Sequence, residues 1–265
     1  MDQLKILVHG ALGKMGQEVV KAACSDPGLE AVAGVDIRAK DKQLLSVDNS
    51  CSVPLTADLE SALSYYHPDV MVDFTVAQVA MRAVRIAIKY NVRMVIGTTG
   101  LSTDELVEIR DLCRSHEIGA VVAPNFSLAA VMMIHLAKKA APYFDYAEII
   151  EMHHEQKVDA PSGTALATAR EMIAARGKAF TYVPASDERI AGSRGGEFEG
   201  VGLHSVRMPG MLAHQEIILG ASGQTLKIRL DQIDREAFMP GVILAIKKVV
   251  EMKEMVLGLD RLLGL

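Results

Sequence analysis

The chain has 265 residues, half of them hydrophobic and 23% charged, and a formal net charge of -5 at pH 7. This composition is that of a packed globular protein, and the length allows one or two domains, of which we expect two. The charge, with no Lys/Arg run interleaved with aromatic residues, argues against a nucleic-acid partner. The longest apolar run, Leu128 to Ile134, is too short to cross a membrane, and we expect no export signal.

The cysteines bear on the compartment. Cys24, Cys51 and Cys113 are widely spaced and odd in number, and they match neither a disulfide framework nor a zinc spacing. We therefore expect three reduced thiols in a cytoplasmic protein.

The first half of the chain alternates short apolar strands with amphipathic helices. The predicted strands are 6–8, a segment ending near Asp36, 70–74, 94–96 and 120–122. Three helices are predicted. The first ends at Asp26-Pro27-Gly28, the second lies around 77–90, and the third, around 103–115, begins with a capping box formed by Ser102 and Glu105. This order predicts an α/β fold, with a Rossmann-like doubly wound parallel sheet over residues 1–126 that binds a dinucleotide.

The second half predicts a smaller α+β domain with a mixed sheet over residues 127–234. Its predicted elements are a helix at about 127–141, a strand at 147–152, a helix from near Gly163 to Gly177, a mobile glycine-rich loop at 186–202, and a hairpin of strands 215–219 and 225–231. A last helix at about 235–250 has Pro240 in its first turns. We expect it to return residues 235–265 to the first domain.

A glycine turn joins the first strand to its helix, with the sequence Gly10-Ala11-Leu12-Gly13-Lys14-Met15-Gly16. A pyrophosphate would meet free N–H groups and the positive end of the helix dipole there. The spacing G-x-x-G-x-x-G departs from the commoner G-x-G-x-x-G, so the motif alone is weak. The alternative is a turn that only permits close packing of helix and strand.

Asp36 strengthens the dinucleotide interpretation. It lies twenty residues past Gly16, at the end of the second strand, where a carboxylate accepts hydrogen bonds from a ribose diol. Its charge would repel a 2'-phosphate, which favours NADH. Arg38 keeps NADPH open, because its guanidinium could pair with that phosphate; the alternative is a solvated loop cation.

Two further loops follow later strands at the carboxyl edge of the sheet, where α/β proteins bind ligands. They are Gly97-Thr98-Thr99-Gly100 and Ala123-Pro124-Asn125-Phe126. Small and hydroxylated residues leave room there for the nicotinamide ribose, and Asn125 can satisfy an amide. Each alone would be a simple turn, but their placement indicates part of the same site.

A dense polar group follows the strand at 147–152, and it consists of His153, His154, Lys157 and the helix start Ser162-Gly163-Thr164. Neighbouring strand residues point to opposite faces, so at most one histidine is expected to face the pocket, unless a loop relaxes this rule. A metal-binding pair is the alternative, but no third ligand lies at a useful local spacing. Ser162 can cap the helix, which leaves the N–H groups of Gly163 and Thr164 as a carboxylate site, and Lys157 adds a positive charge. These groups together describe a pocket for a small dianion.

The run from Glu151 to Ala165 resembles the signature of the dihydrodipicolinate reductases, E-x-H-H-x-x-K-x-D-x-P-S-G-T-A. This signature is long and specific. The glycine turn, the segment from Val95 to Gly100 and the segment from Ala123 to Ser127 fall in the same order as in that family, and Gly202 to Arg207 resembles it more loosely. The similarity therefore covers essentially the whole chain.

The resemblance implies reduction of the cyclic imine dihydrodipicolinate to tetrahydrodipicolinate, in lysine and diaminopimelate biosynthesis, by a cytoplasmic homotetramer assembled through the second domain. It implies that His153 is the proton donor and acceptor and Lys157 the second acid, with His154, Gly163 and Thr164 on the substrate carboxylates. The dinucleotide would be lined by Gly10, Ala11, Leu12, Gly13, Lys14, Met15, Asp36, Gly97, Thr98, Thr99, Ala123, Pro124, Asn125 and Phe126. A histidine suits the proton transfer, because its pKa lies near neutrality.

Two positions depart from the family pattern. Many members carry arginine where this chain has Ile37, directly after the acidic residue, and again where it has Val76. The absence of the arginine at Ile37 weakens the case for NADPH and favours NADH. At Val76 we expect a cofactor contact to be lost, with an effect on activity. Two rival functions remain: a related dehydrogenase acting on another imine or carbonyl, and a protein that senses NAD(H) without turnover.

Overall fold

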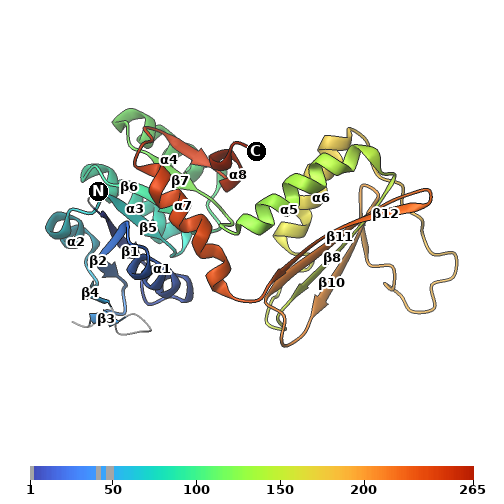
Figure 1. Cartoon of the computed structure of the whole chain (residues 1–265), viewed down its shortest axis with the longest axis horizontal. Helices are drawn as coiled ribbons and strands as arrows, with labels where there is room; N and C mark the ends of the chain where they lie inside the picture. The colour runs from blue at the N-terminus through green and yellow to red at the C-terminus, as the bar shows by residue number, and fades with distance from the viewer. Residues whose placement is uncertain (1–2, 40–42, 46–50) are drawn as a thin grey trace. The chain divides into compact units, whose positions relative to one another are not determined.

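The computed structural model describes residues 3–39, 43–45 and 51–265. The chain forms two compact units (Figure 1). Unit 1 runs to Leu128 and resumes at Phe238, and unit 2 comprises Ala129–Ala237. The sequence-based expectation placed these boundaries a few residues earlier, at 126 and 234.

Unit 1 is built on an eight-stranded sheet in the order β13-β7-β6-β5-β1-β2-β4-β3. The strands are β1 (Leu4–His9), β2 (Leu29–Val35), β3 (Gln43–Leu45), β4 (Ser52–Thr56), β5 (Val70–Asp73), β6 (Arg93–Ile96), β7 (Ala120–Val122) and β13 (Met255–Leu257). All neighbours are parallel except β3, which pairs antiparallel with β4 at the edge. The order reverses between β1 and β5, which makes this the switch point where such sheets bind ligands. The predicted doubly wound parallel fold is confirmed.

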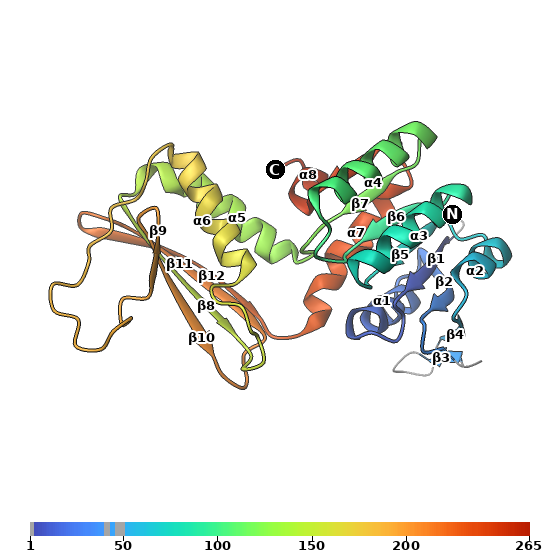
Figure 2. The same ribbon diagram turned by 180° about the vertical axis from the view of Figure 1, so that it is seen from behind.

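Helices cover both faces of this sheet (Figures 1 and 2). They are α1 (Lys14–Ser25), α2 (Leu59–Tyr66), α3 (Ala77–Lys89), α4 (Thr103–His116), α7 (Met239–Val249) and α8 (Leu259–Leu263). The core between the sheet and α2, α3 and α4 includes Leu7 and Met94 from strands and Val84 and Ile109 from helices, all fully buried. Each such side chain contributes about 1.5 to 3 kcal/mol by leaving water. The predicted capping box at Ser102 is present at the start of α4.

The chain returns to unit 1 through a short 3-10 turn, η2 (Arg235–Phe238), and α7. Pro240 occupies the first turn of α7, where its missing N–H is not needed. At Gly241, a Cβ would lie 2.1 Å from the carbonyl oxygen of Phe126, so only glycine lets the helix pack this closely on the loop after β7.

Unit 2 is a five-stranded mixed sheet in the order β12-β11-β8-β10-β9, with β8 and β10 parallel and the other pairs antiparallel. The strands are β8 (Tyr146–His153), β9 (Gly196–Phe198), β10 (Val201–Arg207), β11 (Ala213–Ala221) and β12 (Gln224–Gln232). Two helices, α5 (Leu128–Ala140) and α6 (Gly163–Arg176), pack on one face of this sheet (Figure 2). Gly177 ends α6 in the left-handed conformation, as predicted.

The segment 186–202, expected to be a mobile loop, contains β9 and the start of β10. The expectation of a loop was wrong for 196–198 and 201–202, whereas 186–195 contains no helix or strand. β10 pairs with β8, a strand some fifty residues earlier, and local glycine content does not report such a partner. The sequence analysis also missed β3, β4 and α2, which lie between 43 and 66.

The cysteines also differ from expectation, since Cys24 and Cys51 form a disulfide. The fold brings the end of α1 and the residue before β4 within bridging range, with a Cα–Cα distance of 5.8 Å. Sequence spacing could not reveal this proximity. Cys113 remains a free thiol, and burial raises its pKa to about 11. Among the described residues, no helix combines the length and apolarity needed to span a bilayer.

Candidate active site

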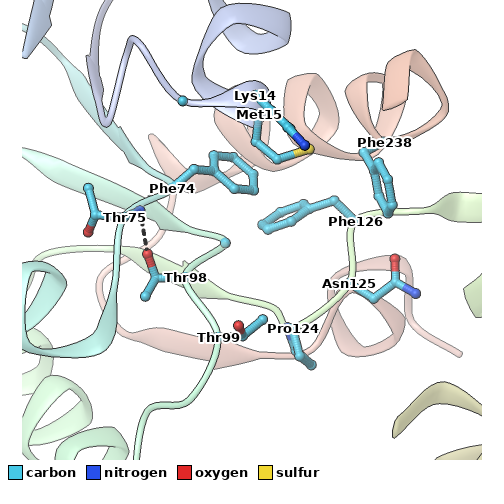
Figure 3. Close-up of a pocket in the computed structure, with 12 residues that line it drawn as sticks. Lys14, Met15, Phe74, Thr75, Thr98, Thr99, Pro124, Asn125, Phe126 and Phe238 are labelled. Carbon is cyan, nitrogen blue, oxygen red and sulfur yellow. Dashed lines mark hydrogen bonds between the residues drawn. The ribbon is translucent and has the colours of Figure 1, made fainter. Parts of the chain in front are cut away.

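A pocket of about 490 Å³ opens in unit 1 at the carboxyl ends of the central strands (Figure 3). Its lining residues are Gly13, Lys14, Met15, Phe74, Thr75, Gly97, Thr98, Thr99, Pro124, Asn125, Phe126 and Phe238. The lining is mostly apolar with a few polar groups, which is typical of a cofactor site. The rings of Phe74 and Phe126 lie 5.9 Å apart and form one wall.

The glycine turn is shaped by close backbone approaches. Gly10 has a φ of 83°, and a Cβ there would lie 2.7 Å from the carbonyl oxygen of Phe74. A Cβ on Gly16 would lie 2.1 Å from the carbonyl oxygen of Gly10. Both positions therefore require glycine, and the tight turn presents the start of α1 to the pocket, where Gly13 and Lys14 line it. Backbone N–H groups and an ammonium at a helix start fit a dinucleotide pyrophosphate.

The buried carboxylate of Asp73, at the end of β5, holds together a hydrogen-bond network beside the pocket. Its Oδ2 lies 2.5 Å from Nδ1 of His9, its register partner on β1, and both side chains are buried. Its Oδ1 accepts from the hydroxyl of Thr98 at 2.5 Å and from that of Thr75 at 2.9 Å. The Thr98 hydroxyl in turn accepts from the N–H of Thr75 at 2.8 Å, the bond drawn in Figure 3. The network fixes two pocket-lining residues to the sheet.

Asp36 follows β2 and is buried, with 7% of its surface exposed. Its carboxylate accepts from the N–H of Leu12 at 3.0 Å and from Nε and Nη2 of Arg38 at 3.0 and 3.2 Å. Burial raises the pKa of Asp36, but the hydrogen bonds from Arg38 and Leu12 outweigh it, so the net pKa lies below the usual value. The carboxylate is therefore ionised at neutral pH and paired with the cation two residues on.

Nine of the predicted cofactor residues line the pocket: Gly13, Lys14, Met15, Gly97, Thr98, Thr99, Pro124, Asn125 and Phe126. Gly10, Ala11, Leu12, Asp36 and Ala123 are not among its lining residues. Ala11 and Ala123 are buried behind the turn and the strand end, and Leu12 donates its N–H to Asp36. Phe74, Thr75 and Phe238 were missed. The first two follow β5 at the same edge and could have been found from that placement, whereas Phe238 arrives from the far end of the chain without any local signal.

In unit 2, His153 ends β8 and its Nδ1 lies 2.5 Å from Oε2 of Glu151. The two side chains share a face because they are two residues apart on a strand. Burial raises the pKa of Glu151, but hydrogen bonds from Arg207, Ser205 and His153 lower it below the usual value, so this carboxylate is ionised. An ionised carboxylate only accepts, so Nδ1 of His153 carries the proton and Nε2 is left for a ligand.

Burial is the largest influence on the pKa of His153 and lowers it. The hydrogen bond and charge of Glu151 oppose this shift, and the charges of Lys157 and Arg207 add to it, so the net pKa lies below the ordinary value. The protonated imidazole therefore gives up its proton readily. A bound anion nearby would raise the pKa of His153 and favour its protonated form.

Lys157 lies in the loop between β8 and α6, and its Nζ donates to Oδ1 of Asp159 at 2.6 Å. The hydrogen bond from Lys157 is the main reason that the pKa of Asp159 lies below its usual value. The Lys157 side chain is 21% exposed. It therefore presents a positive charge near His153 from a fixed position.

The N-terminus of α6 faces open space. Ser162 caps the helix, its hydroxyl accepting from the N–H of Ala165 at 3.2 Å, as predicted. A Cβ on Gly163 would meet no atom within 4 Å. The first N–H groups of a helix have no partner within it, so those of Gly163 and Thr164 suit an anion. His154, half-buried, lies at the other end of the same loop.

Sequence analysis assigned no role to Arg207, which lies opposite His153 where β10 pairs with β8. Its guanidinium grips Glu151 through two bonds of 2.8 Å. The two residues are 56 positions apart, so local spacing carries no sign of the contact. No group of three or more metal-binding side chains occurs in the described ranges.

Comparison with known proteins gives one consistent result. Family models described as dihydrodipicolinate reductase, N-terminus and C-terminus, match residues 4–126 and 129–263. A 4-hydroxy-tetrahydrodipicolinate reductase of Dehalococcoides mccartyi is 54% identical over 265 residues, covering 100% of both chains, and one of Moorella thermoacetica is 47% identical over 262 residues, covering 98% of each. The dipicolinate-bound dihydrodipicolinate reductase from Paenisporosarcina sp. TG-14 superposes with a TM-score of 0.86 at 40% identity, over 98% of this chain and 99% of that one. A pocket at the switch point of a parallel sheet, a helix start that suits an anion and these full-length matches together show that the chain belongs to the dihydrodipicolinate reductase family.

Proposed function

We propose that this protein reduces dihydrodipicolinate, formed from 4-hydroxy-tetrahydrodipicolinate by loss of water, to tetrahydrodipicolinate in lysine and diaminopimelate biosynthesis. It is an NAD(P)H-dependent oxidoreductase. The observation that carries the proposal is the loop from β8 to α6, which holds an oriented imidazole, an ammonium and an open helix start. The related Paenisporosarcina structure, described as dipicolinate-bound, supports a small dicarboxylate as the ligand.

Unit 1 suits the cofactor, a nicotinamide dinucleotide, which supplies a hydride when bound. The glycine turn and Lys14 would hold the pyrophosphate, and Asp36 the adenosine ribose. Thr98, Thr99 and Asn125 would contact the nicotinamide and its ribose. Phe74 and Phe126, whose rings lie 5.9 Å apart, would help to exclude water from the bound nicotinamide.

In unit 2, His153 supplies the proton. Hydride addition to a neutral conjugated imine would leave the anion of an enamine in the substrate, and this anion becomes neutral by gaining a proton at carbon. The Nε2–H bond of protonated His153 breaks, its electron pair stays on Nε2, and Nδ1–H remains bonded to Glu151. Lys157 stabilises the developing negative charge, and His154 with the N–H groups of Gly163 and Thr164 binds the carboxylates.

The test is to supply the purified protein with condensed pyruvate and aspartate semialdehyde and follow oxidation of NADH and NADPH. Rapid oxidation supports the proposal, and monoanionic imine analogues should react poorly because they leave one carboxylate site empty. Equal rates with such analogues would favour a related dehydrogenase. Tight NADH binding with no turnover of any imine would favour a sensor.

NADH is the proposed preferred cofactor, with NADPH as a weaker substrate. The ionised carboxylate of Asp36 suits a ribose diol, while its pairing with Arg38 softens its repulsion of a 2'-phosphate. Arg38→Ala should therefore raise the ratio of the KM for NADPH to that for NADH by about tenfold, a modest factor because the arginine is exposed and screened. Asp36→Ala should raise the KM for NADH and so lower the ratio of the KM for NADPH to that for NADH. If neither variant changes this ratio, Asp36 and Arg38 do not determine the preference for NADH over NADPH.

We also propose a homotetramer assembled through unit 2, in the cytoplasm. The sheet face opposite α5 and α6 carries Ile150 and Ile218, which are only half-buried within the chain, and Tyr146, which is 45% exposed. Apolar side chains on an uncovered sheet face are typical of a subunit interface. Ile218→Glu should yield a smaller species by light scattering, and a wild-type protein that is monomeric at micromolar concentration would refute the assembly.

A further inference from the structure

We propose that Glu151 and Arg207 are positioning residues that hold His153 in the tautomer with a free Nε2 and tie the β8–α6 loop and the start of α6 to it. The inference rests on the proposed function, since it concerns how that proton donor is oriented. Neither residue would touch the substrate. Both act through the groups to which they bond.

Glu151 is the hub of this arrangement. It is buried, with 1% exposed, and four groups donate to its carboxylate. They are Nδ1 of His153, the two terminal nitrogens of Arg207, the hydroxyl of Ser205 and the N–H of Ser162. The bond from Ser162, 3.2 Å to Oε1, reaches the N-cap of α6, while the bond from His153 reaches Oε2. One carboxylate therefore sets both the imidazole and the helix start that suits an anion.

Arg207 adds a second tie to the same loop. Its Nη2 donates to the carbonyl oxygen of Asp159 at 2.7 Å, and its Nη1 to that of Val206 at 2.7 Å. Asp159 also bonds Lys157, so the arginine fixes the backbone of the residue that holds the ammonium. His153, Lys157 and the α6 N-terminus are thus all connected to one Glu–Arg pair.

Stability alone does not account for this pair. Removing two charges from water is costly, and buried ion pairs replaced by neutral groups of similar size are often as stable as the original. The Nε of Arg207 is in addition buried without a hydrogen-bond partner, among the residues that the structure describes. A buried donor left unpaired lowers stability, so the observed geometry points to a constraint from function.

The experiment uses the double variant Glu151→Gln/Arg207→Gln, which removes both charges together and leaves no unbalanced one. We expect a melting temperature near that of the wild type, an unchanged KM for NADH, and a kcat lower by about 10² to 10⁴, because the ring is no longer held with Nε2 outward and the Nδ1–H that remains after proton transfer loses its carboxylate partner. Glu171→Gln is the matched control, since this exposed glutamate pairs with Lys138 in the same unit and lies outside the network. It should keep the wild-type kcat. A double variant that folds and retains the wild-type kcat would overturn the proposal.

A second measurement needs neither turnover nor a variant. Nitrogen-15 NMR of His153 in the wild type should show the neutral ring protonated on Nδ1, whereas neutral histidines commonly carry the proton on Nε2. A wild-type ring protonated on Nε2 would refute the orienting role even if the double variant fails to fold. If the tautomer is as expected but the wild type does not reduce dihydrodipicolinate, the proposed function fails while the positioning role stands.

Discussion

The glycine turn permits a sharp test, because Gly16→Ala adds one methyl group at a position with no room for it. The new Cβ would lie 2.1 Å from the carbonyl oxygen of Gly10, 2.8 Å from its carbonyl carbon and 2.9 Å from the Cα of Ala11. Ordinary contacts between such atoms are 3 Å or longer, so the turn and α1 must separate by about 1 Å. All three obstructing atoms belong to the backbone and cannot rotate away.

Two effects should follow. Overpacking of this kind destabilises a protein by about 1 to 3 kcal/mol. The shift also displaces Gly13, Lys14 and Met15, which line the pocket, and a misplacement of 1 Å at a binding group can lower a rate by about 10²-fold. We therefore expect kcat/KM for NADH to fall by about that factor, mostly through KM, because His153 and Lys157 are not moved.

The assay is NADH binding, followed by fluorescence, together with steady-state rates at saturating imine. Gly28→Ala is the control in the same unit, since its Cβ would meet only side-chain atoms, a carboxylate oxygen of Asp26 at 3.3 Å and the end of Lys247 at 3.8 Å, and no backbone. It should bind NADH as the wild type does. Wild-type affinity for NADH in a folded Gly16→Ala protein would refute the role assigned to the turn.

Three further outcomes are expected. As the acid, His153 must be protonated, so kcat/KM should fall as pH rises through its lowered pKa, on the acid side of about 6.5; a pH-rate profile that is flat between pH 5 and 8 would contradict the assignment. His9→Ala should lower stability by about 1 to 3 kcal/mol, measured by urea unfolding, because buried Asp73 loses one partner; an unchanged midpoint would show that its other hydrogen bonds suffice. Reducing the Cys24–Cys51 bridge, which spans 27 positions, should cost about 3 to 4 kcal/mol and lower the melting temperature, whereas Cys24→Ser should be insensitive to reductant; equal melting with and without reductant in the wild type would show that the bridge does not form in solution.

Local sequence patterns predicted most of the first sheet correctly. Apolar runs at 70–74, 94–96 and 120–122 correspond to β5, β6 and β7, and the helices between them begin and end within a few residues of prediction. These elements carry their own signals, because a buried parallel strand is a continuous apolar run and an amphipathic helix repeats every 3.6 residues. β9 and β10 lack such a signal, because glycines and charges fill 186–202. β10 is a strand through its pairing with the distant β8, and β9 pairs in turn with β10.

The residues proposed for chemistry divide in the same way. The loop from His153 to Thr164 is contiguous, so its imidazoles, ammonium and helix start were visible together, and the family assignment drawn from it is confirmed. The roles of its individual residues stay predictions. Glu151 was part of the same motif, but nothing in the motif distinguished a buried hub from an ordinary strand residue.

Sequence by itself determined the fold class, the family and the chemical character of the loop after β8, because each depends on residues close together in the chain. Only the tertiary structure decided that Arg207 grips Glu151, that Phe238 joins Phe126 in one pocket, and that Cys24 meets Cys51. These contacts join segments separated by between 27 and 112 positions. Such contacts form only when distant parts of the chain pack together, and that packing is a property of the whole folded unit.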